Sequence, residues 1–360
     1  MFFGEIPVKE AEGSLLAHTL KLPGRQLKKG RLLERQDVRD LLTVGYVTVV
    51  GARLEADDLH EDEAADQIAR ALAGTGLKTT PATTGRCNLV AEVDGLLVLD
   101  PQMINKINAV DESITLATAA PYQVVSRGQT VATIKIIPFA ASRQNVDQAV
   151  SLASLRECCR MAPLLSKSVS LILTHSYSHT KDNQEAVLNK AEAAFRTRIE
   201  SLGSRLQSVS RCEHNRRQIA SAISNALSQS CDLLLICGAT ATVDRRDLVP
   251  AAIQDSGGQI DYFGMPADPG NLLLLAHQQQ TPVVIAPGCA RSLKMNGFDW
   301  VLQRLLADQA IQPADIAAMG VGGLLKDKKF SRPVLRVQNN NHPNRQAVSS
   351  VFNMDAVMVR

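Results

Sequence analysis

The 360-residue sequence predicts a three-layer α/β domain with a parallel sheet, preceded by a mixed α+β region that is rich in β-structure. Short apolar runs alternate with helical segments after about residue 166, which is the pattern of a parallel sheet covered by helices. Between about residues 77 and 141, segments rich in β-branched residues are separated by Gly, Pro and Asp. We therefore divide the chain into residues 1–165, 166–325 and a polar tail, 326–360.

The N-terminal region is expected to contain a short strand and helix, an amphipathic helix and then the β-rich part. Asp58, followed three residues later by Glu61, is typical of a helix start. Apolar residues recur after it at helical spacing. Strands are predicted in the runs 88–93, 95–100, 113–118 and 130–138. The polar stretch 142–165 is compatible with helix.

The α/β domain is expected to place buried strands between helices. The predicted strands cover residues 169–174, 206–212, 232–238 and 282–288. The predicted helices cover about residues 183–202, 215–229, 247–256 and 296–307.

Composition excludes several classes of protein. The 39 Lys and Arg against 36 Asp and Glu, with 4% aromatic residues, disfavour nucleic-acid binding as the main task. The apolar runs are shorter than the roughly 18 residues of a membrane span, and the N-terminus has no signal-peptide pattern. Seven cysteines without C-x-x-C spacing indicate neither a disulfide framework nor a zinc site. We expect a cytoplasmic protein.

The loop Gly238–Asp247 follows an apolar strand and precedes a helix, where a parallel sheet receives anions. Its small residues let the backbone approach a phosphate, its two threonines add hydroxyl groups, and its two arginines balance phosphate charge. Asp244 and Asp247 have two interpretations, because they could hold Mg²⁺ against a phosphate or Asp247 could cap the helix.

Two further loops carry Pro-Gly turns at strand ends, Met265–Asn271 and Ala286–Ser292. Either turn alone is most simply a tight connection. Three such loops at one sheet edge favour a binding site.

The order of these loops resembles the molybdopterin-binding domain of the MoaB/Mog type, shared by molybdopterin adenylyltransferases, molybdotransferases and CinA-like proteins. In the resemblance, residues 237–242 match the first loop of that family and Asp247 its helix-start aspartate. Pro269 and Gly270 match the first turn, and Pro287, Gly288 and Ser292 match the last.

The resemblance extends upstream to the MoeA/CinA-like subgroup that is often fused to a cytidylyltransferase-like domain. It is carried by I-P-V-K-E-A-E-G at residues 6–13, by the segments 27–30 and 59–65, by G-R-C-N-L at 85–89 and by K-I-I-P at 135–138. It covers about residues 5–333. No glycine-rich nucleotidyltransferase loop follows.

The resemblance implies a protein of molybdenum cofactor biosynthesis that binds molybdopterin or its nucleotide form. The residues expected to hold the pterin phosphate are Gly238, Ala239, Thr240, Thr242, Arg245, Arg246, Asp268, Pro269, Gly270, Pro287, Gly288, Arg291 and Ser292. Asp244 and Asp247 are expected to be catalytic and to bind Mg²⁺.

Three functions stay open. The first is Mg²⁺-dependent adenylyl transfer or molybdate insertion, with ATP or molybdate as co-substrate. The second is a non-catalytic carrier that presents molybdopterin to a separate nucleotidyltransferase, such as a cytidylyltransferase. The third is a CinA-like nucleotide pyrophosphatase. Other cofactor-biosynthesis proteins are expected as partners, and a homo-oligomer is expected.

Overall fold

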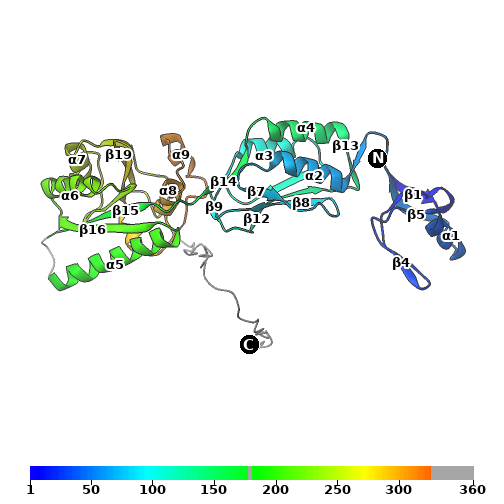
Figure 1. Ribbon diagram of the computed structural model, residues 1–360, viewed down its shortest axis with the longest axis horizontal. Coiled ribbons are helices and arrows are strands. Elements are labelled where there is room, and N and C mark those ends of the chain that lie inside the picture. Colours follow the sequence, from blue (N-terminus) through cyan, green and yellow to red (C-terminus); the bar gives the residue numbers. More distant parts are fainter. Residues whose placement is uncertain (177–180, 326–360) are drawn as a thin grey trace, which may run out of the picture.

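The computed structural model describes residues 1–176 and 181–325, and the side chains of residues 181–183 are not described. The predicted tail, residues 326–360, lies outside the described residues. Figure 1 shows three bodies in a row along the longest axis of the molecule. We call them the N-terminal module (residues 1–53), the middle module (58–163) and the α/β domain (168–325). No helix among the described residues is long and apolar enough to cross a membrane.

The N-terminal module has a small core of its own. Its elements are β1 (Phe2–Pro7), β2 (Leu15–Leu16), β3 (Leu20–Leu22), β4 (Arg25–Leu27), α1 (Arg35–Thr43) and β5 (Thr48–Arg53). The sheet order is β1-β5-β2, and β3 pairs with β4. Leu41 of α1 packs into a buried cluster with Ile6 and Val49. The region therefore contains more strands than the sequence predicts. Three of them, β2, β3 and β4, have only two or three residues and carry no periodic pattern.

The middle module packs helices on one face of a four-stranded antiparallel sheet, β10-β12-β8-β7 (Figure 1). Its helices are α2 (Glu61–Leu72), α3 (Pro101–Asn108) and α4 (Arg143–Ser154). Its strands are β6 (Asp58–His60), β7 (Leu77–Thr79), β8 (Arg86–Ala91), β9 (Gly95–Leu99), β10 (Ile114–Thr118), β11 (Val124–Val125), β12 (Thr130–Ile136), β13 (Ala140–Ser142) and β14 (Cys159–Pro163). The predicted β-rich part is confirmed.

Two elements of the middle module differ from the sequence prediction. Helix α3 lies between two predicted strands, in a stretch for which the sequence predicts no element. Asp100 accepts hydrogen bonds from the backbone at its start, and Pro101 is in its first turn. The stretch predicted to be helical ends as β14, which pairs with β9. This strand is hidden in the sequence because C-R-M-A-P contains no β-branched residue.

The α/β domain contains a six-stranded sheet in the order β16-β15-β17-β20-β19-β18. Its strands are β15 (Ser168–His175), β16 (Arg205–Glu213), β17 (Leu233–Cys237), β18 (Gln259–Phe263), β19 (Leu274–Gln278) and β20 (Thr281–Ala286). Its helices are α5 (Lys181–Ser201), α6 (Arg216–Ser228), α7 (Leu248–Asp255), α8 (Gly297–Leu306) and α9 (Pro313–Ala318). The predicted strands and helices are confirmed. The sheet is mixed, because β19 runs antiparallel to both of its neighbours.

Two apolar layers hold this sheet between helices. On one face, Phe195 of α5 and Phe298 of α8 meet edge to face, with ring centroids 5.6 Å apart. On the other face, Ile223 of α6 and Ile253 of α7 pack against the sheet. All five residues of β17 are buried between the two layers. The carboxyl ends of the central strands are thereby held in fixed positions.

The middle module contacts the α/β domain directly. The Arg304 guanidinium lies 3.6 Å from the centre of the Tyr122 ring. In the segment that joins the two, the backbone N–H of Leu165 donates to the carbonyl of Leu306 at 3.0 Å. Burial lowers the pKa of Arg304. The stacked ring compensates part of the desolvation of this charge.

Candidate functional site

A cavity of about 420 Å³ opens where parallel strands of the α/β domain end. Strands β15, β16, β17 and β20 run parallel, so their last residues lie at one edge of the sheet. Leu173, Val187, Leu188 and Ala191 form an apolar wall. Other lining residues bring polar groups and the loop after β17: Thr174, His175, Ala239 and Arg291. An apolar wall with a few convergent polar groups is typical of a small-molecule site.

The loop after β17 folds tightly over its glycine. A Cβ on Gly238 would lie 2.8 Å from the carbonyl oxygen of Thr240, so this position admits only glycine. The Arg291 guanidinium donates hydrogen bonds to the carbonyl of Gly238 and, at 3.2 Å, to that of Ala239. Two acceptors of the loop are thus covered by a cation. The positive charge beside the loop favours an anionic ligand.

His214 lies next to this loop. His214 follows β16 directly, and its Nδ1 lies 2.8 Å from the Thr174 hydroxyl. Its Nε2 lies 2.9 Å from the Thr240 hydroxyl. The backbone N–H of Ala239 donates to Thr174 Oγ1 at 2.7 Å. Burial lowers the pKa of His214. One chain of hydrogen bonds therefore joins β15, β16 and the loop after β17.

The two aspartates of the loop are engaged with the chain itself. Asp247 caps α7, where its carboxylate accepts hydrogen bonds from the backbone N–H groups of Leu248 at 2.7 Å and Val243 at 3.2 Å. Asp244 accepts from the Arg246 side chain at 2.9 Å, on the exposed surface. Within the described residues, no group of three or more His, Cys, Asp or Glu side chains is placed to hold a metal ion. The expectation that both aspartates bind Mg²⁺ stays a prediction.

The first Pro-Gly turn packs against α8. The Asp268–Pro269 peptide is cis, and the carbonyl of Pro269 accepts from the N–H of Gly297 at 2.9 Å. Gly270 has a φ of +139°, and a Cβ there would lie 2.8 Å from the backbone nitrogen of Gly297. None of the three turn residues lines the cavity described above. The turn thus serves the close approach of two backbone segments.

The second Pro-Gly turn brings Arg291 to the loop after β17. Pro287 and Gly288 open a short 3₁₀ turn, Gly288–Arg291, that follows β20. Ser292 ends it, and its hydroxyl donates to the carbonyl of Cys289 at 3.2 Å. The structure thus brings Gly238, Ala239, Thr240 and Arg291 together. Thr242 is buried, whereas Arg245 and Arg246 are exposed on the surface of the loop.

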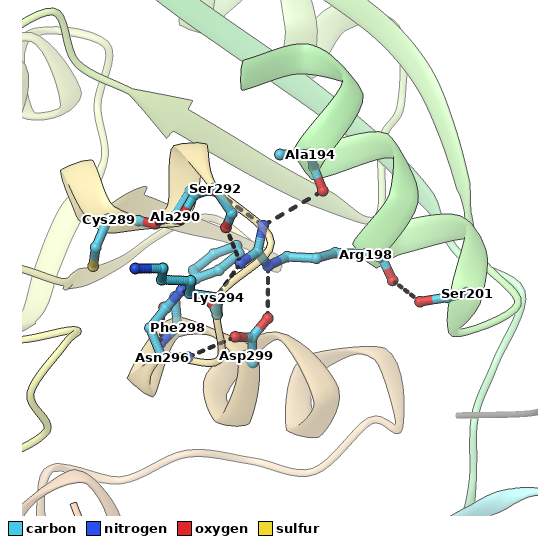
Figure 2. A network of polar contacts seen from close by, with 10 residues as sticks. All are labelled: Ala194, Arg198, Ser201, Cys289, Ala290, Ser292, Lys294, Asn296, Phe298 and Asp299. Carbon is cyan, nitrogen blue, oxygen red and sulfur yellow. Dashed lines mark hydrogen bonds and ion pairs between the residues drawn. The ribbon is translucent and has the colours of Figure 1, made fainter. Parts of the chain in front are cut away.

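A buried ion pair fixes the segment that carries Arg291 (Figure 2). The side chains of Arg198 on α5 and Asp299 on α8 are 1% and 2% exposed, and Arg198 Nε donates to Asp299 Oδ1 at 2.7 Å. The same guanidinium donates to the carbonyls of Ala290 at 2.9 Å, Ser292 at 2.6 Å and Lys294 at 3.1 Å. Arg198 therefore binds three carbonyls in and after this turn. It does not line the cavity and acts by holding the segment that carries Arg291.

Three residues of this arrangement are absent from the sequence-based site: Thr174, His214 and Arg198. Thr174 could have been found, because it ends a predicted apolar strand beside the cavity edge. His214 could have been found by the same argument, one residue after β16. Arg198 lies within a helix and had no such signal, because its partner Asp299 is 101 residues away.

Two segments of the sequence match protein-family models. Residues 5–53 match a domain of unknown function (DUF8806). Residues 170–308 match the probable molybdopterin binding domain. No curated protein matches the sequence.

Several solved structures match in addition. A molybdopterin biosynthesis MoeA protein from Pyrococcus horikoshii has 12% sequence identity and a TM-score of 0.31, and the match covers 85% of this chain and 75% of that one. A molybdopterin biosynthesis protein from Mycobacterium abscessus has 14% identity and a TM-score of 0.26, over 39% of this chain and 92% of that one. Sequence identities and TM-scores this low do not indicate a shared activity. The family model bears most directly on the site, because the matched residues, 170–308, include every residue that lines the cavity.

Proposed function

We propose that the α/β domain binds the phosphate of molybdopterin at the loop after β17, with the pterin ring in the cavity beside α5. The observation that carries this proposal is Arg291, which lines the cavity and donates to the carbonyls of Gly238 and Ala239, so that a cation lies where the loop meets the cavity. The match of residues 170–308 to the molybdopterin-binding family supports this choice of ligand.

The shape of the cavity supports an amphipathic ligand. Its volume of about 420 Å³ falls among those of small-molecule sites. The apolar wall of Leu173, Leu188 and Ala191 offers contact to a flat heterocycle. Arg291 at the other side offers a cation to a phosphate. The two parts of a pterin phosphate would meet the two kinds of surface.

Among the open functions, we favour binding and presentation over catalysis. Both carboxylate oxygens of Asp247 accept backbone hydrogen bonds, and Asp244 pairs with Arg246. These contacts use part of the acceptor capacity of both carboxylates, and each would have to coordinate Mg²⁺ through its remaining lone pairs. A carrier would pass molybdopterin to a separate nucleotidyltransferase, for which the family resemblance suggests a cytidylyltransferase. Mg²⁺-dependent transfer is the alternative.

Binding is tested by obstructing the loop. Thr240→Tyr should weaken binding of molybdopterin at least tenfold, equivalent to about 1.4 kcal/mol, in a titration followed by the absorbance of the pterin. Thr197→Tyr is the matched control, because Thr197 is partly exposed on α5 and does not line the cavity. Equal affinity of the wild type and Thr240→Tyr would remove this loop from the site.

Carriage and catalysis are separated by Asp247. The wild-type protein with molybdopterin, ATP and Mg²⁺ should release no pyrophosphate. Asp247→Asn should keep both the helix cap and the affinity for molybdopterin, because asparagine caps helices as well as aspartate does. Pyrophosphate release by the wild type that Asp247→Asn abolishes would overturn the carrier role and establish Asp247 as catalytic.

A further inference from the structure

We propose that His214 is a positioning residue of the candidate site: its neutral ring, protonated at Nε2, holds the Thr240 hydroxyl as a hydrogen-bond donor for an acceptor oxygen of the ligand. This inference rests on the proposed function for the identity of the ligand. The protonation state of the histidine ring does not depend on which ligand binds.

The hydrogen bonds of Thr174 fix the protonation of His214 Nδ1. Thr174 Oγ1 accepts the backbone N–H of Ala239 at 2.7 Å and lies 2.8 Å from His214 Nδ1. The Thr174 side chain is buried and has one proton to donate. Among the described residues, His214 Nδ1 is the acceptor that lies within hydrogen-bond distance of this hydroxyl. Because an unpaired buried hydroxyl proton is costly, Thr174 donates and Nδ1 is unprotonated.

An unprotonated Nδ1 places the ring proton on Nε2. A neutral imidazole carries one proton, so Nε2–H donates to Thr240 Oγ1 at 2.9 Å. Thr240 then accepts from the ring, and its own hydroxyl proton stays available. Thr240 is exposed and adjoins Ala239, which lines the cavity. The result is an oriented O–H donor beside the site.

The surroundings of the ring favour its neutral form. The ring lies beside Gly238, where the Cβ that glycine lacks would come to 3.6 Å from Cε1 of His214. His214 is about half-buried, and burial lowers its pKa. The charges of Asp247 and Arg291 act on that pKa in opposite directions. The neutral ring is therefore the favoured form near pH 7.

The first test needs no ligand. The full-length chain, labelled with ¹⁵N in its seven histidines, is measured by NMR at pH 7, and His214 is identified by the signals that His214→Gln removes. We expect an unprotonated Nδ1 and a protonated Nε2. A protonated Nδ1, in either the neutral or the charged ring, would overturn the proposal.

The second test measures affinity for molybdopterin. Glutamine can place an amide N–H where Nε2 lies, whereas asparagine is one carbon shorter and reaches only the position of Nδ1. His214→Gln should bind within about threefold of the wild type, and His214→Asn should bind about tenfold more weakly. The control is His277→Asn, since His277 is exposed on β19 and pairs with Asp261.

Thr240→Val completes the test. It should weaken binding about as much as His214→Asn, and the double variant should bind no more weakly than either single variant, because both changes remove the same donor. Additive losses, or a loss in His214→Gln equal to that in His214→Asn, would overturn the positioning role. If the wild type does not bind molybdopterin, the proposed function fails while the NMR result still decides the state of the ring.

Discussion

The buried pair of Arg198 and Asp299 should be the most sensitive point of the α/β domain. Arg198→Met removes the cation but leaves the Asp299 carboxylate 2% exposed and without its partner. Breaking such a pair costs about 3–5 kcal/mol of unfolding free energy. For a domain of this size, that corresponds to a fall in Tm of about 6–20 °C. The turn that carries Arg291 should also loosen, because three of its carbonyls lose their donor.

The assay uses the one tryptophan of the sequence. Trp300 lies in α8 beside Asp299, so its emission during urea unfolding reports on the α/β domain and on no other part of the chain. Arg196→Met is the matched control, because Arg196 lies two residues away on α5 and forms ion pairs that are at least partly exposed to solvent. It should change the unfolding free energy by less than about 0.5 kcal/mol. A loss below about 1 kcal/mol in Arg198→Met would refute the reasoning.

Two further predictions use the same assay. Gly270→Ala should lower the unfolding free energy of the α/β domain by more than about 1 kcal/mol, because Gly270 has a φ of +139° and a Cβ there would press on Gly297. Gly288→Ala is the control and should change the unfolding free energy little, because a Cβ at Gly288 would meet no atom within 4 Å. Equal effects of the two variants would contradict this account of the turns. Burial lowers the pKa of His214, so the unfolded chain binds its proton more tightly. The stability contribution of this residue should be complete above the unfolded pKa of about 6.5 and should fall as the pH drops below it. His214→Gln should show less loss between pH 7.5 and 5.5 than the wild type, and an equal loss would contradict the assignment.

The confirmed sequence predictions concern elements with a long local pattern. The apolar run at residues 233–237 has no polar position, and it is the strand that both helical layers bury. The helices after Asn215 and Asn296 begin with side chains that accept backbone hydrogen bonds, which the residue types already indicate. Strands β2 and β14 were not predicted, because whether so short a segment forms a strand depends on the strand it pairs with, which is β5 for β2 and β9 for β14.

For the site, the residue types alone show which loops are built of small residues and which carry arginines. It could not decide which of them meet. Arg291 reaches the carbonyl of Gly238 across 53 residues of sequence, and the first Pro-Gly turn, equally prominent in the sequence, packs on α8 instead. His214 depends on two threonines, 40 and 26 residues away. Such contacts arise from the order of strands in the sheet, and no local periodicity records that order.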